Sequence, residues 1–197
     1  MIQTKADLIY YLRQDRIMNK RQELSFKTRL RNLLIPDLTM RYLTYLRKAE
    51  YYHNCNNTNG LWGRINELYY GIKCRRLGRK LGYTLSINCF GPGLSLPHIG
   101  TIVVNPETKV GANCRIQACV NIGASAGGNS SPQIGDNVYI GPGAILFGDI
   151  NIANNVTIGA NATVNKSCEQ ENVVLAGSPA QIVKDNYPNW LTFNRVN

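Results

Sequence analysis

The chain has 197 residues, and 44% of them are hydrophobic, which is enough to bury a core in one or two structural units. Its formal net charge of +10 is unevenly divided, because residues 1–90 hold 17 Lys and Arg against 6 Asp and Glu, whereas residues 91–197 hold 5 against 6. No apolar run is long enough for a membrane span or a secretory signal peptide, so we expect a cytoplasmic protein.

The six cysteines form no Cys-x-x-Cys pair and no Cys/His cluster at metal-ligand spacing. This pattern supports neither a zinc site nor a disulfide framework. We therefore expect no metal, and free thiols that are mostly buried.

The N-terminal region, residues 1–82, is predicted to be helical. Thr4 and Asp7 have the spacing of a capping box, which predicts a helix over about 5–18. Two further helices are predicted from Pro36 to about Tyr52 and from Gly63 to about Leu81. These helices would cover the open end of the repetitive domain that follows them.

The excess positive charge lies in this N-terminal region. It would suit a phosphorylated substrate or an anionic membrane surface, and it is equally typical of solvated helix faces. The tyrosines of the region come in adjacent or helically spaced pairs, which suit helix packing better than base stacking, so we expect no nucleic-acid partner. A peripheral contact with the inner membrane face is one hypothesis for this charge.

Aliphatic side chains recur at every sixth position in the second half of the chain. The lattice is interrupted only at Gly128, and a small or β-branched residue follows four places after most lattice positions, as Cys114 and Val120 do. The lattice residues are Val104, Val110, Ile116, Ile122, Ile134, Ile140, Leu146, Ile152, Ile158 and Val164.

A period of six fits neither an amphipathic helix nor an alternating strand. It fits a triangular coil in which each hexapeptide makes one flat face and one corner, so that three units close a coil of 18 residues. Stacked coils would pair in parallel, with the lattice side chains in columns inside the prism. Glycine, Asn and Asp would form the corners, because these residues tolerate positive φ.

We place the repetitive domain at residues 83–182. Residues 123–133 are rich in Gly and Ser and lack the aliphatic residue, which predicts a loop extruded from a corner. Residues 183–197 form a predicted capping tail, in which the stretch from Lys184 to Trp190 would close the far end of the prism.

The sequence GPGLSLPHIGTIVV at residues 91–104, together with the repeats through residues 176–180, resembles the hexapeptide-repeat acyltransferases. Within that family the chain is similar to the serine O-acetyltransferase branch and, most of all, to its relatives in polysaccharide gene clusters. The resemblance covers about residues 80–185. It implies a mainly β fold, a left-handed parallel β-helix preceded by helices, and a homotrimer with acetyl-CoA bound between neighbouring prisms.

The resemblance also assigns roles to residues. His98 matches the histidine that acts as the general base, and a neutral imidazole is suited to accept the proton of an attacking hydroxyl. Coenzyme-binding main-chain groups match positions 18 residues apart. The expected coenzyme-binding residues are Gly123, Ala124, Pro142, Ala160, Lys166 and Ser178, with backbone N–H groups near Gly123 as candidate oxyanion donors.

The chain departs from serine acetyltransferases where the acceptor is recognised. Those enzymes carry an Asp-His pair at the first site and an Arg-His pair in the loop, whereas this chain has Pro97 before His98, and Ser130 and Ser131 in the loop. Tyr83 stands where an acid orients the base. Because the loop contains no Arg or Lys to bind a carboxylate, we expect Ser130, Ser131 and Tyr83 to contact a sugar acceptor, such as a nucleotide sugar or a lipid-linked precursor of a surface polysaccharide.

Two alternatives stay open at this point. The first is serine O-acetylation in cysteine biosynthesis, with Arg115 or a neighbouring subunit binding the carboxylate of serine. The second is a non-catalytic β-helix scaffold, since the fold alone does not establish activity. The helical region could also join trimers into a larger assembly.

Overall fold

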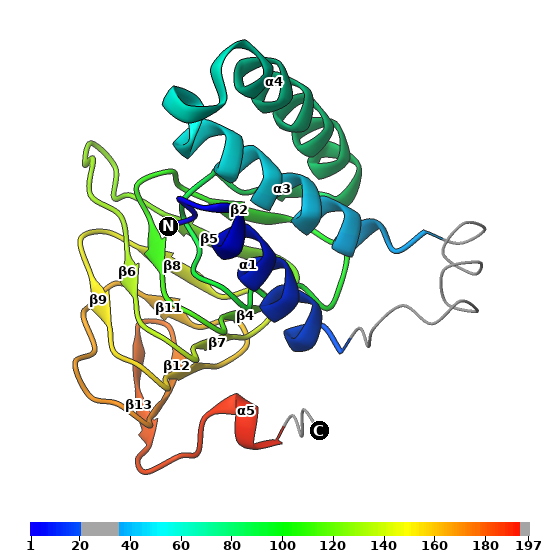
Figure 1. Ribbon diagram of the computed structural model, residues 1–197. Helices are drawn as coiled ribbons and strands as arrows, with labels where there is room; N and C mark the ends of the chain where they lie inside the picture. Colours follow the sequence, from blue (N-terminus) through cyan, green and yellow to red (C-terminus); the bar gives the residue numbers. More distant parts are fainter. Residues whose placement is uncertain (21–35, 194–197) are drawn as a thin grey trace.

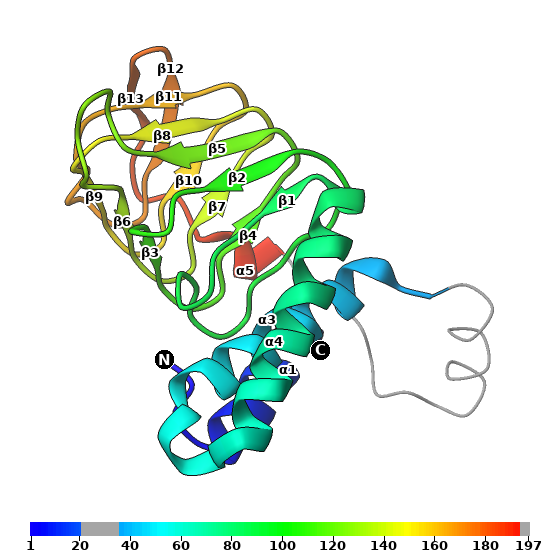
Figure 2. The same cartoon turned by 90° about the horizontal axis from the view of Figure 1, so that it is seen from above.

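A computed structural model describes residues 1–20 and 36–193, apart from the side chains of residues 56–59. Three helices pack at one end of a triangular prism of short strands (Figures 1 and 2). The helices are α1 (Lys5–Met18), α3 (Leu38–Asn54) and α4 (Asn56–Leu81). None of the described helices is both long and apolar enough to cross a bilayer.

The start of each helix follows from local sequence. Thr4 and Asp7 form the predicted capping box, with the Thr4 hydroxyl accepting from the backbone N–H of Asp7 at 3.1 Å. Asp37 caps α3 and accepts from the backbone N–H of Met40 at 3.0 Å. α4 begins seven residues before the predicted start, because a short helical turn joins it across a kink at Gly60, which has a φ of 55°.

The prism has three sheets of short parallel strands, one on each side. One sheet contains β1 (Tyr83–Thr84), β2 (Ile102–Val104), β5 (Val120–Gly123), β8 (Ile145–Phe147) and β11 (Thr163–Val164). A second contains β4 (Arg115–Ile116), β7 (Tyr139–Ile140), β10 (Thr157–Ile158) and β12 (Val174–Gly177), with β13 (Ala180–Lys184) antiparallel to β12. The third contains β3 (Lys109–Val110), β6 (Gln133–Ile134) and β9 (Asn151–Ile152).

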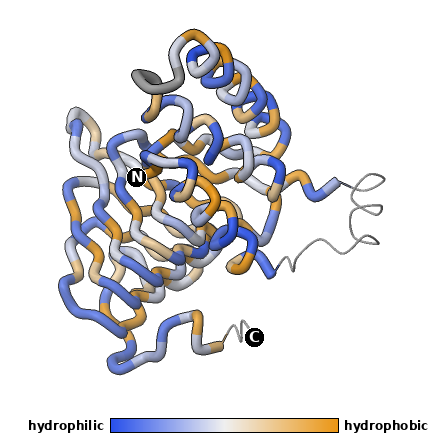
Figure 3. The backbone as a smooth tube through the Cα atoms, in the orientation of Figure 1, coloured by the Kyte–Doolittle hydropathy of each residue, from blue (hydrophilic) through white to orange (hydrophobic). Residues whose placement is uncertain are grey.

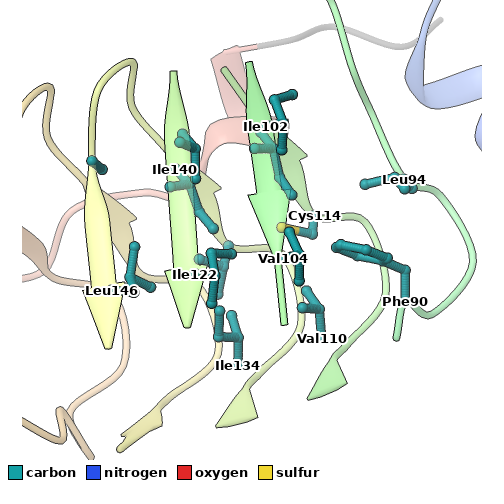
Figure 4. Packing of buried hydrophobic residues seen from close by; sticks show 14 of the residues in the cluster. Phe90, Leu94, Ile102, Val104, Val110, Cys114, Ile122, Ile134, Ile140 and Leu146 are labelled. Atoms are coloured by element: carbon teal, nitrogen blue, oxygen red, sulfur yellow. The ribbon is translucent and has the colours of Figure 1, made fainter. Parts of the chain in front are cut away.

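The predicted lattice forms the interior of the prism. All ten lattice residues are at most 5% exposed, and Figure 4 shows several of them stacked inside the coils, including Val104, Ile122 and Ile140. The small residues four places later are buried too, except Ala126 in the extruded loop. The hexapeptide period therefore reflects which side chains are buried in the interior of the prism.

The interruption of the lattice has a simple geometric cause. Val103 on β2 pairs with Asn121 on β5, 18 residues later, whereas Asn121 pairs with Ile145 on β8, 24 residues later. The extruded loop therefore adds one hexapeptide length to this coil, and the phase of the lattice is kept beyond it.

Asparagines form one corner of the prism. Asn113, Asn137, Asn155 and Asn172 follow one another on successive coils, and each has a φ between 55° and 60°. The side-chain amide of Asn113 donates to the amide oxygen of Asn137, which in turn donates to Asn155, both at 3.0 Å. Positive φ and this ladder of amides explain why Asn recurs there.

The C-terminal tail does not close the far end of the prism as predicted. It runs back along the asparagine corner, where the backbone N–H of Tyr187 donates to the carbonyl of Asn172 at 2.7 Å. The indole N–H of Trp190, in the short helix α5 (Trp190–Phe193), reaches the carbonyl of Asn113 at 3.0 Å. The tail follows this path because the corner offers acceptors that the sheets leave free.

A buried ion cluster attaches the helices to the first coil. Arg47 on α3 is 0% exposed and bonds to the carboxylates of Asp15 on α1 at 2.8 Å and of Glu50 at 3.0 Å. Its guanidinium also donates to the carbonyls of Phe90 and Gly91 at 2.9 and 2.7 Å. Burial opposes the charge of Arg47, but the two carboxylates outweigh it and raise the pKa of the guanidinium above its usual value.

Candidate active site

His98 lies on the corner between the sheet of β4 and the sheet of β2, on the coil next to the helices, and its side chain is exposed. Tyr83 on β1 is 4% exposed, and its hydroxyl donates to the backbone carbonyl of His98 at 2.7 Å. Burial raises the pKa of Tyr83, so this hydroxyl keeps its proton and its role as a donor. Among the described residues, no side chain bonds to the imidazole of His98.

Tyr83 therefore holds the backbone beneath His98 and leaves the ring itself free. Its ring packs edge-on against Tyr42 of α3, with 5.2 Å between centroids. Because Tyr83 is buried in this way, it does not fit the predicted role of contacting an acceptor.

A column of small residues rises from His98 along the same corner. Gly100 lies directly against Ala118, because a Cβ added to this glycine would be 2.9 Å from the Ala118 Cβ. Gly143 donates its N–H to the carbonyl of Ala118, and Asn161 donates to that of Pro142, so Pro142 and Ala160 follow Ala118 on successive coils. At about 4.8 Å per coil, Ala160 lies about 10 Å above Ala118.

Ala124 is not part of this column, which corrects the 18-residue spacing expected from Ala124 through Pro142 to Ala160. Ala124 follows Gly123, which pairs with Phe147 on β8, so it lies beyond the neighbouring sheet. The six residues added by the loop cause the error, because Pro142 stacks on the residue 24 positions before it. That residue is Ala118, which was not identified from the sequence. Counting back 24 positions from Pro142, to allow for the inserted hexapeptide, would have found it.

The remaining predicted residues lie in different surroundings. Pro142, Ala160, Lys166 and Ser178 are exposed, and Gly123 is half-buried at the end of β5. The Ser178 hydroxyl donates to Thr163 at 2.9 Å, near the upper end of the column.

The two loop serines differ in exposure. Ser130 is exposed, but Ser131 is 2% exposed and its buried hydroxyl has no hydrogen-bond partner among the described residues. Ser131 therefore does not present its hydroxyl to a ligand, and the predicted contact with an acceptor does not fit it. Only Ser130 stays a candidate for such a contact.

Cys119 was not expected at this corner. It has a φ of 64° and occupies the place that Gly143 and Asn161 take on the next two coils. All six cysteines are free, and Cys119 is exposed while the other five are buried. An accessible thiol therefore lies beside the column, between His98 and Pro142.

A cavity of about 270 Å³ opens beside the His98 segment. It is lined by Met18, Asn19, Lys20, Asp37, Thr39, Met40, Ser95, Leu96, Pro97 and Arg115. Arg115 is half-buried, lies over the ring of Trp190 with 5.4 Å between its Cζ and the centroid, and has no acidic partner among the described residues. The cavity therefore brings a cation close to the residue that precedes His98.

Residues 131–166 match the family model described as bacterial transferase hexapeptide (six repeats). Residues 131–166 therefore carry the repeat that defines the hexapeptide transferases. This confirms the predicted family, and the structural matches below confirm the predicted left-handed β-helix with N-terminal helices.

The curated proteins that this chain resembles include serine acetyltransferases. One from Staphylococcus aureus is 37% identical over 125 residues, covering 62% of this chain and 54% of the relative. One from Mycobacterium tuberculosis is 35% identical over 101 residues, covering 50% of this chain and 44% of the relative. The chain thus spans about half the length of the curated relatives it matches.

Solved structures of the family share the fold. Serine acetyltransferase from Brucella abortus in complex with coenzyme A has a TM-score of 0.71 and 22% identity, covering 94% of this chain and 71% of that one. The soybean enzyme complexed with serine has a TM-score of 0.69 and 21% identity, covering 91% of this chain and 70% of that one.

These comparisons overturn the preferred acceptor. We expected a sugar hydroxyl and placed the chain closest to the polysaccharide-cluster enzymes, but the relatives above are serine acetyltransferases. The preference was wrong because it gave the absence of Arg and Lys from the loop more weight than the alternative cation, Arg115, which lies outside the loop.

Proposed function

We propose that this chain is an acetyl-CoA-dependent acyltransferase that acetylates the hydroxyl of serine. The observation that carries the proposal is an exposed histidine on a fixed backbone, at the foot of a corner column of small residues, in a chain related to serine acetyltransferases. Because the side chains of this column are small, the main chain of successive coils can approach a long, extended ligand closely.

In this proposal His98 is the general base. A serine hydroxyl is too weakly acidic to attack a thioester unaided, so the neutral imidazole takes its proton as the new ester bond forms. The thiolate of coenzyme A then leaves. Backbone N–H groups near Gly123 lie at the neighbouring corner, so they are candidate donors to the oxyanion of the tetrahedral intermediate formed at the His98 of an adjacent subunit.

Acetyl-CoA would lie along the column, with its thioester near His98. Pro142 and Ala160 would provide main-chain contacts, with Ala118 added to them and Ala124 at the neighbouring corner. Lys166 and Ser178 lie farther along the prism, where the coenzyme's phosphates would be expected. The Brucella abortus relative was solved with coenzyme A, which supports a coenzyme site in this fold.

Arg115 is our candidate for binding the serine carboxylate. A guanidinium can bind a carboxylate through two parallel hydrogen bonds, and among the described residues Arg115 shares the cavity with Asp37 without forming an ion pair with it. Ser130 is the loop residue left to contact the acceptor.

We further propose a cytoplasmic homotrimer with sites between subunits. The free imidazole of His98 supports this arrangement, because a general base needs a partner that fixes its ring and the described part of one chain provides none. Sedimentation analysis of the purified chain tests the trimer.

An acetyl-CoA consumption assay tests the function. We expect release of free coenzyme A with serine, little release with serine amide, which lacks the carboxylate, and none above background with simple or nucleotide sugars. His98→Ala should lower turnover by about 10²- to 10⁴-fold. Binding of acetyl-CoA by calorimetry should persist in this variant.

Three outcomes separate the alternatives. Full activity of His98→Ala would remove the base assignment. Activity on serine amide equal to that on serine would remove the carboxylate site. A chain that binds no acetyl-CoA at all is a scaffold.

A further inference from the structure

α4 carries an exposed apolar face that no described residue covers. Leu61 and Trp62 are 74% and 75% exposed, and Ile65, Leu68 and Tyr69 are each about half exposed or more. Their spacing places them on one side of the helix. We call these five residues the α4 outer face. Figure 3 shows hydrophobic and hydrophilic residues alternating along α4, which lies at the margin of the molecule.

This face points directly away from the side on which α4 is held. Cys74, Leu77 and Leu81 are buried against α3 and the first coil. Gly78 is part of that contact, since a Cβ there would lie 2.6 Å from the carbonyl oxygen of Tyr83. At 100° per residue, the outer face lies on the opposite side of the helix, so it plays no part in the chain's own core.

The C-terminal part of α4 is strongly basic. Arg75, Arg76, Arg79 and Lys80 are all exposed there, and Arg64 is exposed within the apolar part. Glu67 is the only acidic residue in the helix, and it bonds to the ring of His53 at 2.7 Å. The helix therefore presents an apolar surface with a positively charged end.

We propose that the α4 outer face binds the surface of an anionic membrane. Trp and Tyr suit the boundary between headgroups and acyl chains, and Arg side chains beside them pair with anionic headgroups. Charge favours this occupant over a second copy of the chain, because two copies would bring together two helical regions that each carry an excess of positive charge. Each basic residue near such a surface strengthens binding by about fivefold.

Vesicle co-sedimentation of the full chain tests the proposal. We expect binding to vesicles of phosphatidylcholine mixed with phosphatidylglycerol, weaker binding to phosphatidylcholine alone, and a decline with added salt. Trp62 fluorescence should shift to shorter wavelength on binding, measured in a Trp190→Phe background.

Two sets of variants separate the apolar and charged contributions. Trp62→Glu with Leu68→Glu should abolish binding, and Arg75→Gln with Arg76→Gln and Arg79→Gln should weaken it by about 100-fold. The matched control is Ile182→Glu with Val183→Glu, which changes two exposed apolar residues on β13, beyond the far end of the prism, and should bind as the parent does. Circular dichroism verifies that each variant is folded.

Two results would overturn the proposal. One is vesicle binding that is absent or that the α4 variants leave unchanged. The other is concentration-dependent self-association that the same variants abolish while vesicles bind nothing, which would assign the face to a second copy of the chain. Neither result bears on serine acetylation, because the acetyl-CoA assay is run without vesicles.

Discussion

The hydroxyl of Tyr83 donates a hydrogen bond to the backbone carbonyl of His98, with 2.7 Å between the two oxygens. The bond joins the first strand of the prism to the segment that presents the proposed base. A tyrosine thus supports the histidine through its main chain, where an acidic residue would act on the ring.

Tyr83→Phe should lower kcat/KM about tenfold while leaving acetyl-CoA affinity unchanged, because small displacements of a catalytic group reduce the rate steeply. Stability should fall by about 1 kcal/mol, since a partly buried carbonyl loses its donor. The control is Tyr42→Phe, which removes a hydroxyl from the neighbouring buried ring and should affect stability alone. Equal rate losses in both variants would show that Tyr83 has no positioning role.

Cys119 should be the thiol that reacts with iodoacetamide in the native protein. Burial raises the pKa of Cys74 and Cys89 to about 11, so both stay protonated and unreactive at mildly alkaline pH. Because Cys119 lies beside the proposed coenzyme column, coenzyme A should slow its alkylation, as measured by mass spectrometry. Free serine is the control ligand. Alkylation at the same rate with and without coenzyme A would place the ligand elsewhere.

Ile140→Asp should prevent folding of the prism. The side chain is 0% exposed in the lattice, and a carboxylate there would be buried without a partner, which costs several kcal/mol. The matched substitution Ile145→Asp, at a 44% exposed position on the next strand, should leave the circular dichroism spectrum unchanged. A folded Ile140→Asp protein would contradict the assignment of the lattice to the interior.

Arg47→Met should destabilise the chain by about 3–5 kcal/mol, because Asp15 and Glu50 would remain buried without their cation. Urea unfolding measures the loss. Arg13→Met, at an exposed position on α1, should change stability by less than about 0.5 kcal/mol. A similar small effect for both would show that the cluster does not hold the helices to the first coil.

The sequence by itself determined the repetitive architecture and its interior. Residues such as Ile116 and Ile158 recur every six positions because each coil buries the same place in its unit, and this local periodicity is visible without coordinates. The capping box at Thr4 and Asp7 was equally readable, since a helix N-terminus depends on a few consecutive residues. His98 was found through resemblance, and its role stays a proposal.

The tertiary structure alone decided how distant segments meet. Ala118 joins Pro142 because the loop adds one hexapeptide to the coil between them, and sequence spacing does not show which residues leave the prism. The path of the tail from Tyr187 to Trp190 along the asparagine corner is likewise set by contacts between distant segments. Tyr187 and Trp190 both donate to backbone carbonyls, and a free carbonyl has no signature in the identity of its residue.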